Sequence, residues 1–576
     1  MKSLFKHLRP YRKECVLGPL LKLAEATLEL LVPLVVAAII DRGIGGGDRP
    51  YVVWMSLLMA LLGLVGLAFS VTAQYFCAKA AVGFGARLRQ ALFRHIQKLS
   101  YRTLDEVNTA TLVTRLTGDM NLVQTGVNLT LRLLLRSPFV VFGAMIMAFT
   151  LDVQGALVFV VIIPVLFAAV FGIMLPCIPL YKRVQGRLDT LLGRTRENLA
   201  GVRVIRAFRK EEAERTAFEE NNYALTTSQL FVGRVSALLN PLTYVLINGA
   251  ILVLLWTGAI RVEQGLLTQG IVVALYNYMS QILVELIKLA NLIISITKAI
   301  AGGNRIAAAL ALPTAPDADT APAPVAGAPR IELQGVTVQY HPTAAPALED
   351  VSLSVAAGET LGIIGGTSAG KTTLVNLIPR FYAPTVGQVL VDGADVQNIP
   401  AATLRGRIGM VPQRSVLFRG TVRENLQWGN PDASDEQLWE ALRAAQGEEM
   451  IRQKDGGLDA PVEQDGRNFS GGQRQRLAIA RALVRRPDIL ILDDSAAALD
   501  YATEAALRQA LGTLPYHPTT LLISQRVATV RHADRIAVLD EGRLVGLDTH
   551  ESLLNTCEVY REICRAQNRE EDGAHA

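Results

Sequence analysis

Six long apolar runs, all within the first 300 residues, constrain the fold of this 576-residue chain more than any other feature. They lie at about 16–40, 52–77, 128–150, 155–178, 236–260 and 266–296. A bilayer core about 30 Å thick needs roughly 20 apolar residues of helix, so each run is long enough to cross a membrane. No comparable run follows residue 300. The sequence therefore predicts an all-α domain with six transmembrane spans over residues 1–312, embedded in a lipid bilayer.

Basic residues indicate which side of the membrane the ends of the spans face. The first 13 residues contain five Lys or Arg and no acid, and the segment 78–127 contains seven. The short loops at the opposite ends of the spans contain fewer, and Lys and Arg accumulate on the cytoplasmic side of membrane proteins. We therefore expect both termini and the two long loops, 78–127 and 179–235, to be cytoplasmic, with the spans in the inner (cytoplasmic) membrane. Both loops keep the apolar spacing of helices, so the spans should project beyond the lipid.

Charged residues within the spans have two interpretations. They are Lys22, Glu25 and Glu29 on one face of the first span and Glu285 and Lys288 on one face of the sixth. Ionisable groups are costly inside a bilayer and usually mark a functional site or a buried pair. These five residues either line a translocation cavity or form salt bridges, and the sequence leaves both open. Arg132 and Arg136 lie near a membrane boundary, where long basic side chains are expected to reach lipid head groups.

A segment rich in Pro and Ala separates the spans from the rest of the chain. Residues 313–330 read PTAPDADTAPAPVAGAPR, which is too broken for a helix and is typical of an extended linker. From residue 331 strand-like and helix-like runs alternate, which predicts an α/β domain with a parallel sheet over residues 331–576. Half of all residues are hydrophobic and only 19% are charged, a composition that excludes a disordered chain.

Two motifs in this second domain predict a P-loop nucleotide site. A strand-like run at 360–364 leads into GGTSAGKT, which matches G-x(4)-G-K-[ST]. In such a loop backbone N–H groups surround phosphate oxygens, Lys371 reaches the outer phosphates and the Thr372 hydroxyl binds Mg²⁺. The apolar strand 489–492 ends in Asp493, which is placed to hold Mg²⁺ through water. The predicted nucleotide-binding residues of the loop are Gly365, Gly366, Thr367, Ser368, Ala369, Gly370, Lys371, Thr372 and Thr373.

A third motif indicates the class of nucleotide-binding domain. Phe469, Ser470, Gly471, Gly472 and Gln473 precede a helix-like run, and with these residues the chain resembles the ATP-binding cassette (ABC) family. The resemblance covers almost the whole chain, since six spans, a linker and one cassette are the layout of a half-size ABC exporter. It implies that ATP and Mg²⁺ are ligands and that two cassettes enclose two ATP molecules. It also implies that Ser470, Gly471, Gly472 and Gln473 of one chain close on the phosphates held by another.

The resemblance assigns roles to further residues. Gln413 falls where the family has the glutamine that contacts Mg²⁺ and the attacking water, and Tyr340 matches the aromatic residue that stacks on adenine. Residues 498–500 resemble the loop through which the two ATP sites communicate. The cytoplasmic segments 104–115 and 202–212 resemble the coupling helices of exporters, which contact a cassette.

Two positions depart from the family pattern. Asp494 stands where the family has the glutamate that polarises the attacking water. The carboxylate of Asp is one methylene shorter, and a general base must lie within about 2.6–3.2 Å of the proton that it takes. Gln525 stands where the family has a histidine that contacts the γ-phosphate, and a glutamine carries no positive charge. None of the seven histidines occupies that position; they are His7, His95, His341, His517, His532, His550 and His575.

We therefore expect this chain to bind Mg-ATP and to hydrolyse it poorly at its own site. An intact Phe469–Gln473 segment beside such a site implies a different partner. The pattern resembles the degenerate-site subunit of a heterodimeric bacterial multidrug exporter, whose second, non-identical chain is then expected to carry Glu and His at the altered positions. The expected cargo is a small hydrophobic or amphipathic compound.

Other functions are compatible with the same residues. The chain could be an active homodimeric exporter, an importer or lipid translocator on the same fold, or a non-transporting ATP-gated regulator or channel. The spans argue against a soluble ATPase. No basic stripe with interleaved aromatic residues indicates nucleic-acid binding, and the cytoplasmic loops account for the net charge of +5.

Overall fold

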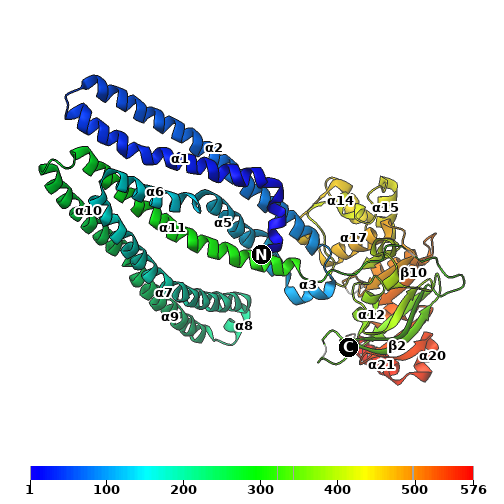
Figure 1. Cartoon of the computed structure of the whole chain (residues 1–576). Helices are drawn as coiled ribbons and strands as arrows, with labels where there is room; N and C mark the ends of the chain where they lie inside the picture. The colour runs from blue at the N-terminus through cyan, green and yellow to red at the C-terminus, as the bar shows by residue number, and fades with distance from the viewer. Residues whose placement is uncertain (1, 321, 342, 496–497, 575–576) are drawn as a thin grey trace. The chain divides into compact units, whose positions relative to one another are not determined.

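The computed structural model describes residues 2–320, 322–341, 343–495 and 498–574, so His575 and one residue of the predicted linker, Ala321, lie outside the described residues. The chain divides into two compact units (Figure 1). The first comprises Met1–Gln97 and Asn108–Leu312, and the second comprises Lys98–Val107 and Pro313–Ala576. A short segment of the N-terminal half therefore groups with the C-terminal unit.

Six long helical stretches form the first unit, and each is long and apolar enough to cross a membrane. They are Ser3–Ile44, Arg49–Ile96, Thr109–Leu151, Val153–Ala200, Glu211–Glu263 and Gln269–Leu310. The predicted six-span helical domain is confirmed; the sixth stretch begins three residues later than expected. The individual helices are α1 (Arg12–Ala38), α2 (Arg49–Ile96), α4 (Thr109–Thr114), α5 (Met120–Leu133), α6 (Arg136–Leu151), α7 (Val153–Ala200), α8 (Val202–Ala207), α9 (Glu211–Ala237), α10 (Leu239–Glu263) and α11 (Gln269–Leu310), with a 3-10 helix at Lys2–Tyr11 and π-helical turns at Ile39–Ile44 and Arg115–Asp119.

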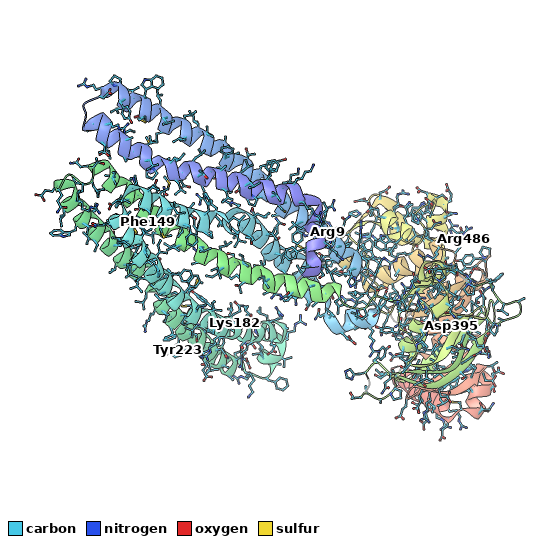
Figure 2. The ribbon with its side chains drawn as sticks, viewed as in Figure 1. Arg9, Phe149, Lys182, Tyr223, Asp395 and Arg486 are labelled. Carbon is cyan, nitrogen blue, oxygen red and sulfur yellow. The ribbon has the colours of Figure 1, made fainter. Side chains whose placement is uncertain are left out.

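Several of these helices are much longer than a bilayer is thick. α2 and α7 contain 48 residues each. At 1.5 Å per residue such a helix is about 72 Å long, more than twice the ~30 Å hydrocarbon core. α7 and α9 run side by side to the short α8 that follows α7 (Figure 1), and Lys182 and Tyr223 mark this part of the pair (Figure 2). The helices are therefore long enough for the projection beyond the lipid that the sequence predicts.

Apolar side chains of α1, α6, α7, α10 and α11 form one core of the first unit, and those of α2, α5 and α11 form another. Tyr278 of α11 is fully buried in the first of these cores, and its hydroxyl donates a hydrogen bond to the carbonyl oxygen of Leu30 on α1 at 2.7 Å. On α2, by contrast, Trp54, Leu61 and Leu64 are exposed. Apolar side chains on the outside of a spanning helix are those expected to face lipid.

Arg136 of α6 joins three helices of the first unit. Its side chain donates to Glu285 of α11 at 2.5 Å and to Glu29 of α1 at 2.6 Å, and the residue is only 7% exposed. Ser137 donates to the second carboxylate oxygen of Glu285 at 2.7 Å. The expectation that Arg136 reaches lipid head groups is therefore wrong, because carboxylates on two neighbouring helices hold its guanidinium inside the bundle.

Lys22, Glu25 and Lys288, the other charged residues named above for the first and sixth spans, are also in ion pairs. Lys288 contacts Glu285 at 2.8 Å, and Lys22 contacts Glu25 at 2.5 Å. The side chain of Glu29 stays 42% exposed beside Arg136. Of the two interpretations that the sequence leaves open, the contacts support salt bridging for all five residues.

A mostly parallel sheet forms the centre of the second unit, which confirms the predicted α/β fold. Its strand order is β12-β11-β3-β10-β9-β6, with only β12 antiparallel to its neighbour. β9 is buried along its whole length. The strands are β3 (Thr360–Gly365), β6 (Ile408–Val411), β9 (Ile489–Asp493), β10 (Thr519–Ile523), β11 (Arg535–Asp540) and β12 (Arg543–Asp548). A separate antiparallel sheet contains β1 (Ile331–Val338), β2 (Leu348–Val355), β4 (Val386–Val391) and β5 (Ala394–Asp395), and a third small sheet pairs β7 (Gly420–Thr421) with β8 (Pro461–Val462).

Helices cover the sheet and build a second apolar core. Leu426, Leu438 and Leu477 of α14, α15 and α17 are buried in that core. The helices of the second unit are α12 (Lys371–Leu377), α13 (Ala401–Gly406), α14 (Val422–Gln427), α15 (Asp435–Ala444), α16 (Glu448–Arg452), α17 (Gly471–Val484), α18 (Tyr501–Gly512), α19 (Val527–Val530), α20 (His550–Thr556) and α21 (Glu558–Ala574).

The short helix α3 (Tyr101–Val107) belongs to the second unit. The ring of Tyr101 stacks on Phe381 with 4.4 Å between centroids. The hydroxyl of Tyr382 donates to the carboxylate of Asp105 at 2.5 Å. The first of the two segments expected to contact a cassette therefore overlaps a helix that packs on one, whereas the second, at α8, stays a prediction.

Candidate nucleotide-binding site

A cavity of about 330 Å³ lies at the carboxyl ends of β3, β9 and β10. In open α/β sheets ligands bind in this position, because the loops that follow parallel strands meet there. Four segments that the sequence predicts to bind nucleotide come together around it. The lining residues are Ala347, Thr367, Ser368, Ala369, Gly370, Lys371, Thr372, Thr373, Gln413, Asp493, Asp494, Ile523 and Gln525.

The backbone of the phosphate loop explains two of its three glycines. Gly370 has φ +95°, and a Cβ there would lie 2.5 Å from the carbonyl oxygen of Ala347. A Cβ on Gly365 would lie 2.2 Å from the carbonyl oxygen of Leu539. Gly366 has open space around the position of a Cβ, so packing does not require glycine there. A backbone this tight is typical of loops whose N–H groups turn toward an anion.

Lys371 is folded back onto the loop from which it projects. Its ammonium donates to the carbonyl oxygens of Gly365 at 2.8 Å and Gly366 at 2.7 Å. Burial lowers the pKa of Lys371, while Asp494 and Asp493 act in the opposite direction. The ammonium is therefore held at the edge of the cavity by two neutral acceptors, which phosphate oxygens can replace with a stronger, charge-assisted partner.

Thr372 and Asp493 form the predicted magnesium side of the cavity. The hydroxyl of Thr372 donates to a carboxylate oxygen of Asp493 at 3.3 Å. Burial raises the pKa of Asp493, and the neighbouring Asp494 adds to that shift. A hydroxyl, a carboxylate and the Gln413 amide oxygen are the hard donors that Mg²⁺ prefers, usually together with substrate phosphates. These residues therefore fit Mg²⁺, which would supply positive charge to the phosphates.

Asp494 occupies the position of the expected catalytic carboxylate. It has φ +49°, and its N–H donates to the carbonyl oxygen of Ile523 at 3.0 Å, which ties it to the end of β10. The amide of Gln413 donates weakly to the Asp494 carboxylate at 3.5 Å. Both side chains face the same cavity, as the sequence predicts, although their roles there stay predictions.

Gln525 also lines the cavity, and a residue that no motif marks holds its backbone. The side chain of Gln567 on α21 donates to the carbonyl oxygen of Gln525 at 2.7 Å and accepts from the N–H of Val527 at 2.8 Å. This pair of hydrogen bonds clamps the loop on both sides of Arg526. Because Gln567 lies more than 40 positions along the chain and in no motif, the sequence gives no signal for it.

Tyr340 stands beside the cavity rather than in its lining. Its hydroxyl donates to the hydroxyl of Thr373 at 3.1 Å, and 40% of the residue is exposed. Its ring meets that of Tyr382 edge-on, with 5.2 Å between centroids. One aromatic ring is therefore fixed next to the phosphate loop with surface available for stacking, and it is linked through Tyr382 to Asp105 of α3.

The segment Phe469–Gln473 does not reach this cavity. Ser470 caps α17: its hydroxyl accepts from the N–H of Gln473 at 3.3 Å, and its own N–H donates to the Gln473 side chain at 2.9 Å. Gly472 packs so closely on the loop 498–500 that a Cβ would lie 2.9 Å from the carbonyl oxygen of Ala498. The cavity of this chain is therefore not lined by Ser470, Gly471, Gly472 or Gln473. Their predicted contact with phosphate is not made there.

Comparisons with known families match both units. Residues 15–286 match the family described as ABC transporter transmembrane region, and residues 348–497 match the family described as ABC transporter. The structure of a bacterial Atm1-family ABC exporter with ATP bound superposes with a TM-score of 0.81 at 25% identity, covering 97% of this chain and 98% of that one.

Three curated relatives span nearly the whole chain. An uncharacterised ABC transporter ATP-binding protein of Mycobacterium tuberculosis H37Rv is 38% identical over 572 residues, covering 98% of this chain and 97% of the relative. A candidate multidrug export ATP-binding/permease protein of Bacillus subtilis is 31% identical and covers 99% of both chains. The ATP-dependent lipid A-core flippase of Syntrophus aciditrophicus is 32% identical, covering 99% of this chain and 95% of the flippase.

Proposed function

This chain belongs to the ABC transporter family, and we propose that it is one subunit of a heterodimeric exporter that binds Mg-ATP at its own site but hydrolyses it poorly there. The family and the exporter fold indicate that the chain is a multi-pass membrane protein. They also imply that its cassette binds ATP and couples ATP hydrolysis to transport. Half-size exporters of this fold act as dimers. The proposal concerns two further points: that the second chain is a different protein, and that ATP hydrolysis at this chain's own site is slow.

The observation that carries the proposal is the composition of one cavity. Asp494 and Gln525 line the same space as Lys371, Thr372 and Asp493. The three residues that would hold phosphate and Mg²⁺ are of the expected types, whereas the two that would act on water and the γ-phosphate are not. The substitutions therefore bear on the chemical step rather than on binding.

Two magnitudes support a low rate at this site. Losing a general base typically costs about 10²–10⁴-fold in rate, and losing one charge-stabilising donor costs about 10²–10³-fold. Asp494 keeps a carboxylate but with a shorter reach, and Gln525 keeps a hydrogen-bonding side chain but no charge. Even if each substitution lowers the rate by only part of the smaller factor, 10²-fold, hydrolysis here is slow relative to a site with the family's Glu and His.

The position of the signature segment supports a partner chain. Ser470 and Gly472 stand outside the cavity of their own chain while the capping of α17 is complete. In the proposed dimer they close on the ATP held by the partner, which carries Glu and His at the altered positions. Hydrolysis in that composite site resets the pump, while ATP bound beside Asp494 and Lys371 keeps the two cassettes together.

The proposed setting is the inner membrane, with both termini and the cassette in the cytoplasm. The basic first 13 residues and the basic segment 78–127 support this orientation. We propose a hydrophobic or amphipathic cargo, because the spans are apolar and their charges are paired. The relatives named for multidrug export and for lipid A-core flipping support the same class of cargo.

Purification of the chain alone and with its candidate partner tests the proposal. The chain alone should bind a fluorescent ATP analogue yet show little ATPase activity, and the pair should be active. Changing the partner's catalytic Glu to Gln should abolish activity of the pair, whereas Asp494→Asn in this chain should leave most of it. Robust ATPase from the chain alone, or an intact rate after the partner's substitution, would favour the homodimer instead.

Transport assays separate the alternatives that share this fold. Inside-out vesicles that take up a fluorescent amphipathic dye upon ATP addition indicate export. Uptake only into right-side-out vesicles indicates import, and movement of labelled lipid between leaflets indicates a translocator. ATP-dependent conductance without any cargo flux indicates a gated channel or regulator.

A further inference from the structure

A short basic helix precedes the first span and is anchored on the membrane unit. It is the 3-10 helix Lys2–Tyr11, and Figure 2 labels its residue Arg9. Leu4 of this helix is only 2% exposed, and it belongs to a core that also contains Phe84 of α2 and Ile306 of α11. The helix is therefore held against the bundle at a fixed level along the first span.

The period of this helix separates its side chains into rows. A 3-10 helix has three residues per turn, so residues three apart lie above one another. Leu4 belongs to the row that packs on the bundle. The second row contains Phe5, which is 50% exposed, and the third contains Lys6 and Arg9, which are both exposed. An apolar row beside a basic row is typical of helices that lie at a membrane surface.

Four exposed basic side chains of this region have no acidic partner in the described part of the chain. We call them the N-terminal basic face: Lys6, Arg9, Arg12 and Lys13. Residues 1–13 contain no acid. The first acid that follows, Glu14, is already paired with Lys79 of α2 at 3.0 Å. The positive charge of this face is therefore available to an anion from outside the chain.

Apolar side chains that face lipid follow these bases directly. Val16, Leu17 and Leu20 of α1 are 58%, 44% and 55% exposed, and they belong to a helix that is long and apolar enough to cross a membrane. Lys13 precedes Val16 by three residues, or about 4.5 Å of helix. The N-terminal basic face therefore lies at the level of the lipid head groups.

We propose that the N-terminal basic face binds the head groups of anionic phospholipids in the surrounding bilayer. Lys and Arg donate to the phosphate oxygens of any phospholipid, but only an anionic lipid brings a net negative charge to four bases. Phe5 would lie among the adjoining acyl chains. Each Lys or Arg near an anionic membrane surface contributes about fivefold in affinity. The lipid composition of the membrane should thus determine how firmly the start of the first span is held.

Other occupants match this surface less well. A free phosphate ion would neutralise bases but leave Phe5 and Val16 exposed to water. A nucleic acid or an acidic protein would have to bind where lipid-facing side chains begin. Exposed bases also occur at 203–210, but they lie more than 20 residues past the apolar run 155–178, which is roughly 30 Å of helix. They are therefore too far from the bilayer for lipid and provide a matched control.

Photo-crosslinking of the full chain in phosphatidylcholine nanodiscs tests the proposal. The probes are phosphatidylglycerol and phosphatidylcholine with identical acyl chains and a photoactivatable group near the head group, each added at trace level so that the bilayer stays neutral. Crosslinks to residues 3–20 are counted by peptide mass spectrometry. Phosphatidylglycerol should crosslink there at least about tenfold more than phosphatidylcholine. In 1 M NaCl, where the Debye length is about 3 Å, this ratio should fall at least about fivefold.

Matched variants identify the side chains responsible. Replacing all four bases of the N-terminal basic face by Gln should bring the ratio to within about twofold of one. Exchanging Lys for Arg and Arg for Lys at the same positions should preserve it, because the charge is kept. The control, which replaces Arg203, Arg206, Arg209 and Lys210 by Gln, should leave it unchanged. If the first variant does not insert, Lys6→Gln/Arg9→Gln takes its place and should lower the ratio at least about threefold.

Four results would overturn the proposal. One is a ratio near one in the unsubstituted chain, and another is an undiminished ratio after the bases are replaced. A third is an equal loss in the control variant, which would assign the effect to overall charge. The fourth is loss of the ratio with inorganic phosphate but not with chloride at the same ionic strength, which would identify a free phosphate ion as the ligand.

Discussion

The Asp494→Glu variant gives a quantitative test of the proposal that this site hydrolyses ATP slowly. The added methylene moves the carboxylate by about 1.5 Å. A general base works within a window of about 2.6–3.2 Å, so the change is more than twice the width of that window. The cavity of about 330 Å³ has room for the longer side chain. If reach is the missing property, Asp494→Glu should therefore recover a working base.

The expected gain follows from the usual contribution of such a base. A factor of 10²–10⁴ corresponds to about 2.7–5.4 kcal/mol of barrier at 1.36 kcal/mol for each tenfold change. The single variant Asp494→Glu should raise hydrolysis at this site at least about tenfold, because the charge at Gln525 is still missing. Adding Gln525→His should bring the gain into the 10²–10⁴ range.

A single-turnover assay isolates this site from that of the partner. The dimer carries a Glu→Gln substitution in the partner, which silences the partner's site, and hydrolysis of radiolabelled ATP is followed by rapid quench. Asp494→Asn is the matched control, since it keeps the size of the side chain but removes any basicity, and its rate should stay within a few-fold of the unsubstituted chain. A loss of 100-fold or more in Asp494→Asn would show that Asp494 already acts as a base, and would refute the reasoning.

Three further predictions concern the phosphate loop, the clamp and the membrane unit. Gly370→Ala should abolish binding of a fluorescent ATP analogue because of its positive φ and close backbone contact, whereas Gly366→Ala should bind normally; equal binding by both would contradict this. Gln567→Ala removes two hydrogen bonds worth about 1 kcal/mol each, so hydrogen exchange at residues 525–527 should accelerate about 5–30-fold, and unchanged exchange would rule out the clamp. Arg136→Met removes the guanidinium between Glu285 and Glu29, leaves the buried Glu285 with Lys288 as its one cationic partner, and should destabilise the membrane unit by up to about 3–5 kcal/mol, with recovery in Arg136→Met/Glu285→Met; a double variant no more stable than the single one would argue against this pairing.

Local sequence patterns were sufficient for the framework of the molecule. Length and apolarity predict the six spans, because few other structures hold some 20 apolar residues in succession. Motifs predict which residues meet in the nucleotide cavity, because the loops after β3, β9 and β10 must converge at one edge of a parallel sheet. The separation of Ser470 from that cavity also agrees with the expectation that this segment serves another chain.

Long-range contacts between side chains could not be predicted in the same way. Arg136 was expected at the lipid surface, but it pairs with carboxylates on two helices that lie more than 100 residues away in the sequence. Gln567 and Tyr382 reach their loops only through tertiary packing. Such features depend on which surfaces pack together, and one sequence does not specify that locally.

The identity of the nucleotide held at this chain's site during turnover tests the central claim most directly. The assembled dimer, turning over ATP with 8-azido-[α-³²P]ATP present, is irradiated, and the label on each chain is separated and identified as tri- or diphosphate. The account predicts that this chain retains mostly triphosphate, because Asp494 and Gln525 replace the catalytic pair, while the partner carries diphosphate. Diphosphate accumulating on both chains at equal rates would contradict it.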